Sequence, residues 1–147
     1  MAIIKPVDES KIFIQDVPHF GSEEQQISML RLDAMHPIIS GNKWYKLQYN
    51  LEAAIQQNCA GILTFGGAFS NHLIATAAAA QANNIESIGI VRGIPEPQNK
   101  PNSVLQQCQD YGMKLVFISR EEYAQKDSLP FLEQLNNHYP QYYIIPE

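Results

Sequence analysis

The sequence of 147 residues lacks most features of disulfide-stabilised, membrane-spanning or secreted proteins. Its two cysteines, Cys59 and Cys108, form no CxxC or Cys/His pattern, so we expect free thiols and no metal site. The longest nearly apolar run, residues 73–80, is far shorter than the roughly 20 residues that span a membrane. The start of the chain lacks the apolar core of a secretory signal. We therefore expect a cytoplasmic protein with no membrane partner.

An excess of positive charge is also missing. The chain has 10 Lys plus Arg residues against 15 Asp plus Glu, which gives a net charge of -5. Because no basic run could neutralise a row of phosphates, nucleic acid is excluded as an expected partner. The composition, 45% hydrophobic and 17% charged, is typical of one globular domain and excludes disordered, collagen-like and coiled-coil chains.

Short apolar runs alternate with amphipathic or alanine-rich runs, which is typical of an α/β chain. We predict strands at 27–32, 61–65, 87–91, 114–118 and 142–145. We predict helices at 43–57, 70–82 with Ser70 as N-cap, 102–111, and a helical region over 120–138 that is broken before Pro130. From residue 61 onward the crossovers are long enough for parallel pairing, so the predicted fold is a three-layer αβα sandwich around a parallel sheet.

The sequence at each end of the chain predicts that the protein is incomplete. The chain ends directly after the last predicted strand, where an α/β enzyme places a functional loop. The strand at 27–32 precedes the repeating pattern and is expected to belong to another layer.

The segment from Thr64 to His72 (TFGGAFSNH) is the first candidate for chemistry. Glycines let the backbone approach a ligand, and the free amides at the following helix N-terminus favour an anion. The segment matches neither GxGxxG nor GxxxxGK[ST], so a dinucleotide or nucleoside triphosphate is not indicated. A simple glycine turn with a serine cap explains the same residues equally well.

The second candidate is the segment SGNKWYKL at 40–47. A lysine in the first helical turn lies near the positive end of the helix dipole, which favours the neutral amine that a nucleophile requires. The alternative is that Lys43 and Lys46 are ordinary exposed lysines, as most lysines are. His36, before a proline, is interpreted as a turn residue rather than a metal ligand.

Together these motifs resemble a known family. The segments 40–47 and 64–80 (TFGGAFSNHLIATAAAA), followed by GIVRG at 89–93, are similar to the pyridoxal-phosphate enzymes of the 1-aminocyclopropane-1-carboxylate deaminase and D-cysteine desulfhydrase family, which have the tryptophan synthase β-like fold. The resemblance covers nearly the whole chain, including DYGMKLVFISREEY at 110–123.

The resemblance implies roles for individual residues. Lys43 matches the lysine that bonds pyridoxal 5'-phosphate covalently, and Lys46 matches the second lysine of the same pattern and is the weaker candidate. Ser70, Asn71 and His72 match the loop that holds the substrate carboxylate, with Asn71 also beside the ring oxygen of the cofactor. Ser70 is a further candidate for a catalytic role.

The resemblance also implies a domain organisation. Residues 1–46 would be a fragment of the large cofactor-binding domain that includes the lysine, and residues 47–147 would be the small αβα domain. Family members are about twice as long, and their phosphate-binding cup and pyridine-nitrogen partner would lie beyond Glu147. We therefore expect the full-length protein to be a homodimer and this chain alone to be inactive.

The implied reaction is a lyase or deaminase reaction on a small amino acid. Family members with His after Ser-Asn resemble D-cysteine desulfhydrase, so His72 favours β-elimination to pyruvate and ammonia. The alternative within the family is ring opening of 1-aminocyclopropane-1-carboxylate. Two alternatives of other classes are a flavodoxin-like or Rossmann-like binding module and a non-catalytic αβα fragment.

Overall fold

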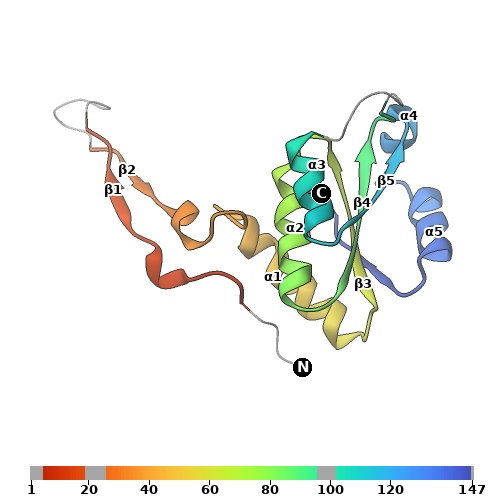
Figure 1. The fold of residues 1–147 in the computed structure, drawn as a ribbon, viewed down its shortest axis with the longest axis horizontal. Coiled ribbons are helices and arrows are strands. Elements are labelled where there is room, and N and C mark those ends of the chain that lie inside the picture. The colour runs from red at the N-terminus through yellow and green to blue at the C-terminus, as the bar shows by residue number, and fades with distance from the viewer. Residues whose placement is uncertain (1–4, 19–25, 96–101, 147) are drawn as a thin grey trace.

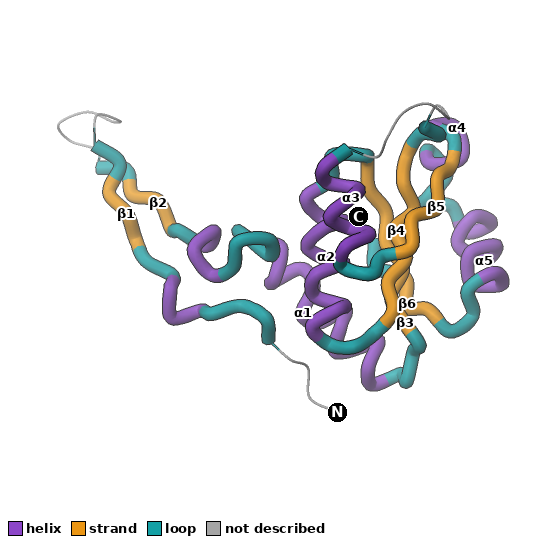
Figure 2. The backbone as a smooth tube through the Cα atoms, in the orientation of Figure 1, coloured by secondary structure: helices purple, strands orange, loops and turns teal. Residues whose placement is uncertain are grey.

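The computed structural model describes residues 5–18, 26–95 and 102–146, and Figure 1 shows two unlike regions. The first is a two-stranded ribbon of β1 (Ile14–Asp16) and β2 (Ser28–Leu30), which pair antiparallel. Short 3-10 turns flank it at Glu9–Lys11 and Leu32–Met35. The second region, residues 43–146, is an α/β unit, and the ribbon extends away from it (Figures 1 and 2).

The α/β unit is built on a four-stranded parallel sheet in the order β5-β4-β3-β6. Its strands are β3 (Gly61–Gly67), β4 (Glu86–Arg92), β5 (Lys114–Ile118) and β6 (Tyr142–Ile144). Helices α1 (Lys43–Gln56), α2 (Asn71–Ala82) and α3 (Ser103–Asp110) lie on one face, and α5 (Leu129–His138) lies on the other (Figures 1 and 2). The short α4 (Arg120–Tyr123) follows β5. The predicted α/β class with a parallel sheet is confirmed.

Strand β3 shows why the central strands are mostly apolar. Ile62 packs with α1 and α2, whereas Leu63 and Phe65 pack on the opposite face with side chains of α5. Because both faces are covered, no polar alternation is possible in this strand. On the first face, all residues of α2 from Leu73 to Ala80 are buried, and their small side chains let neighbouring helices approach closely.

The predicted elements agree with the structure to within a few residues, with two differences. Strand β1 was not predicted, and the strand expected at 27–32 is shorter because Leu32 begins a 3-10 turn. The break predicted before Pro130 is confirmed, because α4 and α5 are separate helices and α5 has Pro130 in its first turn, where proline needs no hydrogen-bond donor.

The boundary expected between residues 46 and 47 falls inside α1. Met35 and Ile39 are buried in the same apolar cluster as Trp44 and Leu47. The segment before α1 therefore packs on the α/β unit, and the division into a large-domain and a small-domain part stays a prediction. None of the helices in the described ranges combines the length and the apolarity that crossing a membrane requires.

Candidate functional site

The turn between β3 and α2 brings three of the predicted site residues together. Ser70 is the N-cap of α2, and its Oγ accepts hydrogen bonds from the backbone N–H groups of His72 (3.2 Å) and Leu73 (3.4 Å). Its own N–H donates to the carbonyl of Gly67 at 3.0 Å. Both lone pairs of the hydroxyl are thus engaged, so the group that Ser70 offers to a ligand is its O–H donor.

Gly66 allows the turn to close tightly against the helix. A Cβ built on Gly66 would lie 2.7 Å from Leu73 Cγ and 2.8 Å from both Cβ and Oγ of Ser70. Asn102 holds the other side of the turn, because its Nδ2 donates to the carbonyl of Ala68 at 2.8 Å while its Oδ1 caps α3. The start of α2 is therefore held from two directions.

Behind the turn, His72 is linked to the sheet through Thr64. The buried Thr64 hydroxyl donates to the carbonyl of Ile145 at 3.1 Å and lies 2.9 Å from His72 Nε2. Since the hydroxyl hydrogen is used on Ile145, the His72 ring must donate from Nε2 to Thr64. That nitrogen cannot also donate to a substrate carboxylate, so Nδ1 is the atom through which His72 would reach one.

Lys43 is the first residue of α1 and is half-buried, whereas Lys46 is exposed. The preceding turn contains Gly41 in the left-handed region, with φ at 63°. Figure 1 shows α1 and α2 on the same side of the sheet, and the two helices share one apolar cluster. In the described part of the chain, the Lys43 side chain hydrogen-bonds to neither Ser70 nor Asn71.

His36 organises the turn that leads to Lys43. Its Nδ1 accepts the backbone N–H groups of Ile38 and Ile39, both at 3.0 Å. Burial, and then the charge of Lys11, lowers the pKa of His36 below its ordinary value. A neutral ring is needed because protonation of Nδ1 would remove the acceptor of both bonds. The interpretation of His36 as a turn residue fits this geometry.

The described residues contain no group of three His, Cys, Asp or Glu side chains that could hold a metal ion. Cys59 and Cys108 are both free thiols, and burial raises the pKa of Cys108 to about 11. Neither thiol lies in the turn described above.

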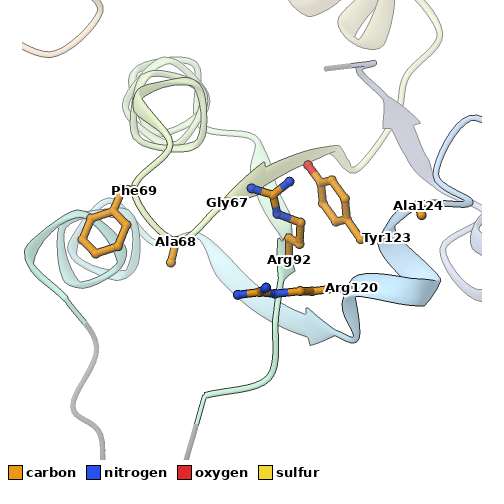
Figure 3. A pocket seen from close by; sticks show the side chains of 7 residues that line it. All are labelled: Gly67, Ala68, Phe69, Arg92, Arg120, Tyr123 and Ala124. Atoms are coloured by element: carbon orange, nitrogen blue, oxygen red, sulfur yellow. The ribbon is translucent and has the colours of Figure 1, made fainter.

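Sequence reasoning missed the roles of several residues around this turn. Thr64 lies in the predicted segment 64–72 but was given no role, although a polar residue inside an apolar strand is a recognisable signal. Arg92 ends β4 and Arg120 begins α4, and with the turn residues 67–69 they line a hollow of about 520 Å³ (Figure 3). No sequence pattern joins these two arginines, because they meet only through the pairing of β4 with β5.

Comparison with known proteins identifies relatives, although no family model matches the chain. A protein named as a 1-aminocyclopropane-1-carboxylate deaminase of Pyrococcus abyssi is 30% identical over 108 residues, which is 74% of this chain and 32% of that protein. The mitochondrial bifunctional D-cysteine desulfhydrase/1-aminocyclopropane-1-carboxylate deaminase of Arabidopsis thaliana is 31% identical over 117 residues, 74% of this chain and 29% of that protein. The chain is homologous to part of these enzymes. The resemblance to the deaminase/desulfhydrase family predicted from the sequence is confirmed.

Solved structures support the same fold. The crystal structure of a homologue of 1-aminocyclopropane-1-carboxylate deaminase matches 92% of this chain with a TM-score of 0.70 at 24% identity, over 42% of its own length. A hydrogen sulfide-producing enzyme from Fusobacterium nucleatum matches 90% of the chain with a TM-score of 0.63 at 12% identity, over 41% of its length. The chain spans between 29% and 41% of the length of the curated deaminase/desulfhydrase relatives that it matches.

Proposed function

We propose that the protein acts with pyridoxal phosphate on a small amino acid, and that it eliminates the β-substituent of D-cysteine to form pyruvate and ammonia. One observation carries the proposal. The Ser70-capped start of α2 presents a hydroxyl and an amide at the carboxyl end of β3, on the same side of the sheet as the helix that begins with Lys43. The names of the Arabidopsis and Fusobacterium relatives agree with this chemistry.

The donor set of the turn fits the cofactor and its substrate. Ser70 has one free O–H donor, Asn71 is exposed in the first turn of α2, and the helix dipole favours an anion there. Such donors suit a substrate carboxylate and the ring oxygen of the cofactor. Lys43 would hold the cofactor covalently, and Asn71 would contact its ring oxygen. When bound, pyridoxal phosphate supplies an electron sink for negative charge at the substrate Cα.

The residues of this chain would then have separate roles in the reaction. Ser70 and Asn71 would hold and orient the substrate carboxylate, and the Lys43 amine would be the base that takes the proton from Cα. The net reaction would convert D-cysteine and water to pyruvate, ammonia and hydrogen sulfide, the sulfide leaving Cβ with the bonding electrons and taking up a proton. Ser70 acts as a donor rather than a base, because its oxygen already accepts two N–H groups.

His72 has a narrower role in this proposal than the sequence suggested. Its Nε2 is engaged with Thr64, so His72 anchors the turn through that nitrogen. Only the charged ring has a second N–H, at Nδ1, with which to bind the substrate carboxylate.

Ring opening of 1-aminocyclopropane-1-carboxylate is the second candidate, because the Pyrococcus and Arabidopsis relatives carry that name. The two candidates differ in the bond that breaks, and both produce ammonia. Ammonia and keto-acid release from each substrate separates them: turnover of D-cysteine is expected, and turnover of the cyclopropane substrate alone would reject the elimination.

The covalent assignment is tested by borohydride reduction of the full-length protein with pyridoxal phosphate, followed by peptide mapping. We expect the pyridoxyl group on Lys43, its loss in Lys43→Ala, and its retention in the matched control Lys46→Ala. A label confined to Lys46 would refute the assignment. Since Lys43 is half-buried at a helix start, the circular dichroism of Lys43→Ala should match that of the parent.

The same proposal includes the domain organisation implied by the family. Residues 1–46 would contribute to a larger cofactor-binding domain, residues 47–147 would form the small domain, and the whole protein would be a homodimer. The exposed apolar side chains of the ribbon support a covering partner for residues 1–46. Sedimentation of the protein that carries this chain tests the dimer.

A further inference from the structure

Two positively charged side chains line a hollow at the carboxyl-terminal edge of the sheet. It measures about 520 Å³ and is lined by Gly67, Ala68, Phe69, Arg92, Arg120, Tyr123 and Ala124. This volume lies within the range of small-molecule pockets. Figure 3 shows that the two guanidinium groups extend into the same hollow. The chain has three arginines, and two of them line this one place.

Arg92 is held in position by its surroundings. Its guanidinium carbon lies 5.6 Å from the centroid of the Tyr123 ring, a cation–π contact. Tyr123 is itself buried and packs edge-on against Phe65 at 6.4 Å. On the other side, a Cβ added to Gly67 would lie 3.6 Å from Arg92 Nη2. The absence of a side chain at Gly67 thus leaves one flank of the guanidinium open.

Arg120 approaches from the next strand. Arg92 pairs with Ile118 in the β4–β5 register, so Arg120 begins α4 two residues beyond that pair. A capping box between Ser119 and Glu122 fixes the direction of α4. Glu122 is thereby turned to the cap of its own helix, because its carboxylate accepts the Ser119 N–H at 2.8 Å.

No acidic side chain is among the seven residues that line the hollow. Arginine remains charged at any physiological pH, so two like charges share this space in a chain whose net charge is -5. Their mutual repulsion is relieved by a ligand with two negative charges. Guanidinium groups also bind the oxygens of phosphate and carboxylate in a bidentate manner.

We propose that this hollow binds a doubly charged oxyanion, namely the phosphate group of a small molecule. Arg92 and Arg120 each donate to its oxygens, and the backbone at Gly67 and Ala68 forms the adjoining wall. Ser70 is not among the lining residues, although Gly67, Ala68 and Phe69 precede it in the same turn. It uses none of the groups assigned to the proposed function.

The test measures binding of inorganic phosphate to the 147-residue chain at low salt. Binding is followed by NMR of the Gly67 amide and of the arginine Nε–H groups. Arg120→Gln is expected to weaken binding at least about tenfold, as loss of a charge-assisted bidentate contact does. Arg92→Gln should weaken it similarly, and acetate should bind at least about tenfold more weakly than phosphate. Arg31→Gln is the matched control, since Arg31 is already paired with Asp33.

The hollow is not an oxyanion site if Arg120→Gln keeps the affinity of the parent, if Arg31→Gln loses as much, or if acetate binds as well as phosphate. Arg120 is exposed, so folding of its variant is not in question. Lys43→Ala is expected to keep phosphate affinity within about twofold, and an equal loss there would overturn the assignment to the arginines. The proposed function fails on a different result, the absence of the pyridoxyl label from Lys43.

Discussion

The two-stranded ribbon and the α/β unit both carry large apolar side chains, but only the unit buries them. In the ribbon, Ile14 is 70% exposed and Leu30 is 55% exposed, whereas in the unit Leu47 and Leu63 are 0% exposed. Every residue of β1 and β2 is exposed. Large apolar side chains therefore stabilise the α/β unit through burial, whereas in the ribbon they remain exposed to solvent.

The number of layers explains the difference. The four-stranded sheet has helices on both faces, so each apolar residue of β3 has a neighbour to pack against. The ribbon has two strands of three residues and no covering layer among the described residues. Two strands alone are marginally stable in water. An apolar strand pattern thus shows that a segment pairs, but it does not show what covers it.

The largest expected contrast is in hydrogen exchange. The amides of β3 and β4 are central and buried, so they should open only with the unit as a whole, whereas those of β1 and β2 should open locally. We expect protection factors that differ by on the order of a thousandfold or more. NMR-detected exchange of Leu63 and Ile88 against Gln15 and Met29 measures this. Equal protection in a monomer would show that the ribbon is stable by itself.

A matched pair of leucine truncations sharpens the comparison. Leu47→Ala leaves a cavity in the core and should lower the free energy of unfolding by about 3 kcal/mol. Leu30→Ala removes a side chain that is half exposed and should cost less than about 0.5 kcal/mol. Urea denaturation of both variants measures the difference, and similar losses would contradict the contrast between the regions.

Two adjacent glycines test how tightly the turn before α2 is packed. Gly66→Ala places a methyl group within 2.7 Å of Leu73 and should destabilise the unit by about 2 kcal/mol. Gly67→Ala meets its nearest neighbour at 3.6 Å, so its free energy of unfolding should stay within about 0.5 kcal/mol of the parent. Thermal melts of both variants provide the measurement. A stable Gly66→Ala variant would mean that the turn can widen.

The smallest effect concerns His36, in the segment that joins the two regions. Its pKa is lowered by burial and by Lys11, so the folded state prefers the neutral ring. Above the ordinary pKa of 6.5, His36 makes its full contribution to the free energy of unfolding. This contribution is lost as the pH falls through the lower folded-state pKa, because the unfolded chain takes up the proton first. The loss should be less than about 1 kcal/mol, because solvent screens a partly exposed group.

The variant His36→Asn isolates this effect, since an amide oxygen can accept the same N–H groups and does not titrate. Urea midpoints measured from pH 7.5 to pH 5 should fall less for the variant than for the parent. Identical slopes would exclude His36 as the titrating group.

Local pattern was sufficient for most of the α/β unit. The Ser70 cap and the strand at 114–118 follow from short-range rules, since a helix start and an apolar strand are each determined by a few neighbouring residues. Strand β1 was missed because three exposed residues carry too little periodicity to be distinguished from a loop.

Contacts between distant segments could not be predicted in the same way. Thr64 meets Ile145 only because β6 pairs beside β3, and Arg92 meets Arg120 only because β5 pairs beside β4. The segments around Lys43 and Ser70 were recognised separately, but the sequence does not show how helices α1 and α2 pack against each other. Strand order, which the sequence does not state, determines the first two relations, and side-chain packing between the helices determines the third.

The hydrogen bond from Thr64 to Ile145 has a consequence for the order of events during synthesis. Thr64 and His72 leave the ribosome more than 70 residues before Ile145, so for that time the hydroxyl has no carbonyl of β6 to donate to. Until β6 docks, the Thr64 proton can point at the His72 ring instead, and either ring nitrogen can carry the histidine's proton. The imidazole therefore acquires its final tautomer from the backbone carbonyl of Ile145, a residue that is translated well after the histidine itself.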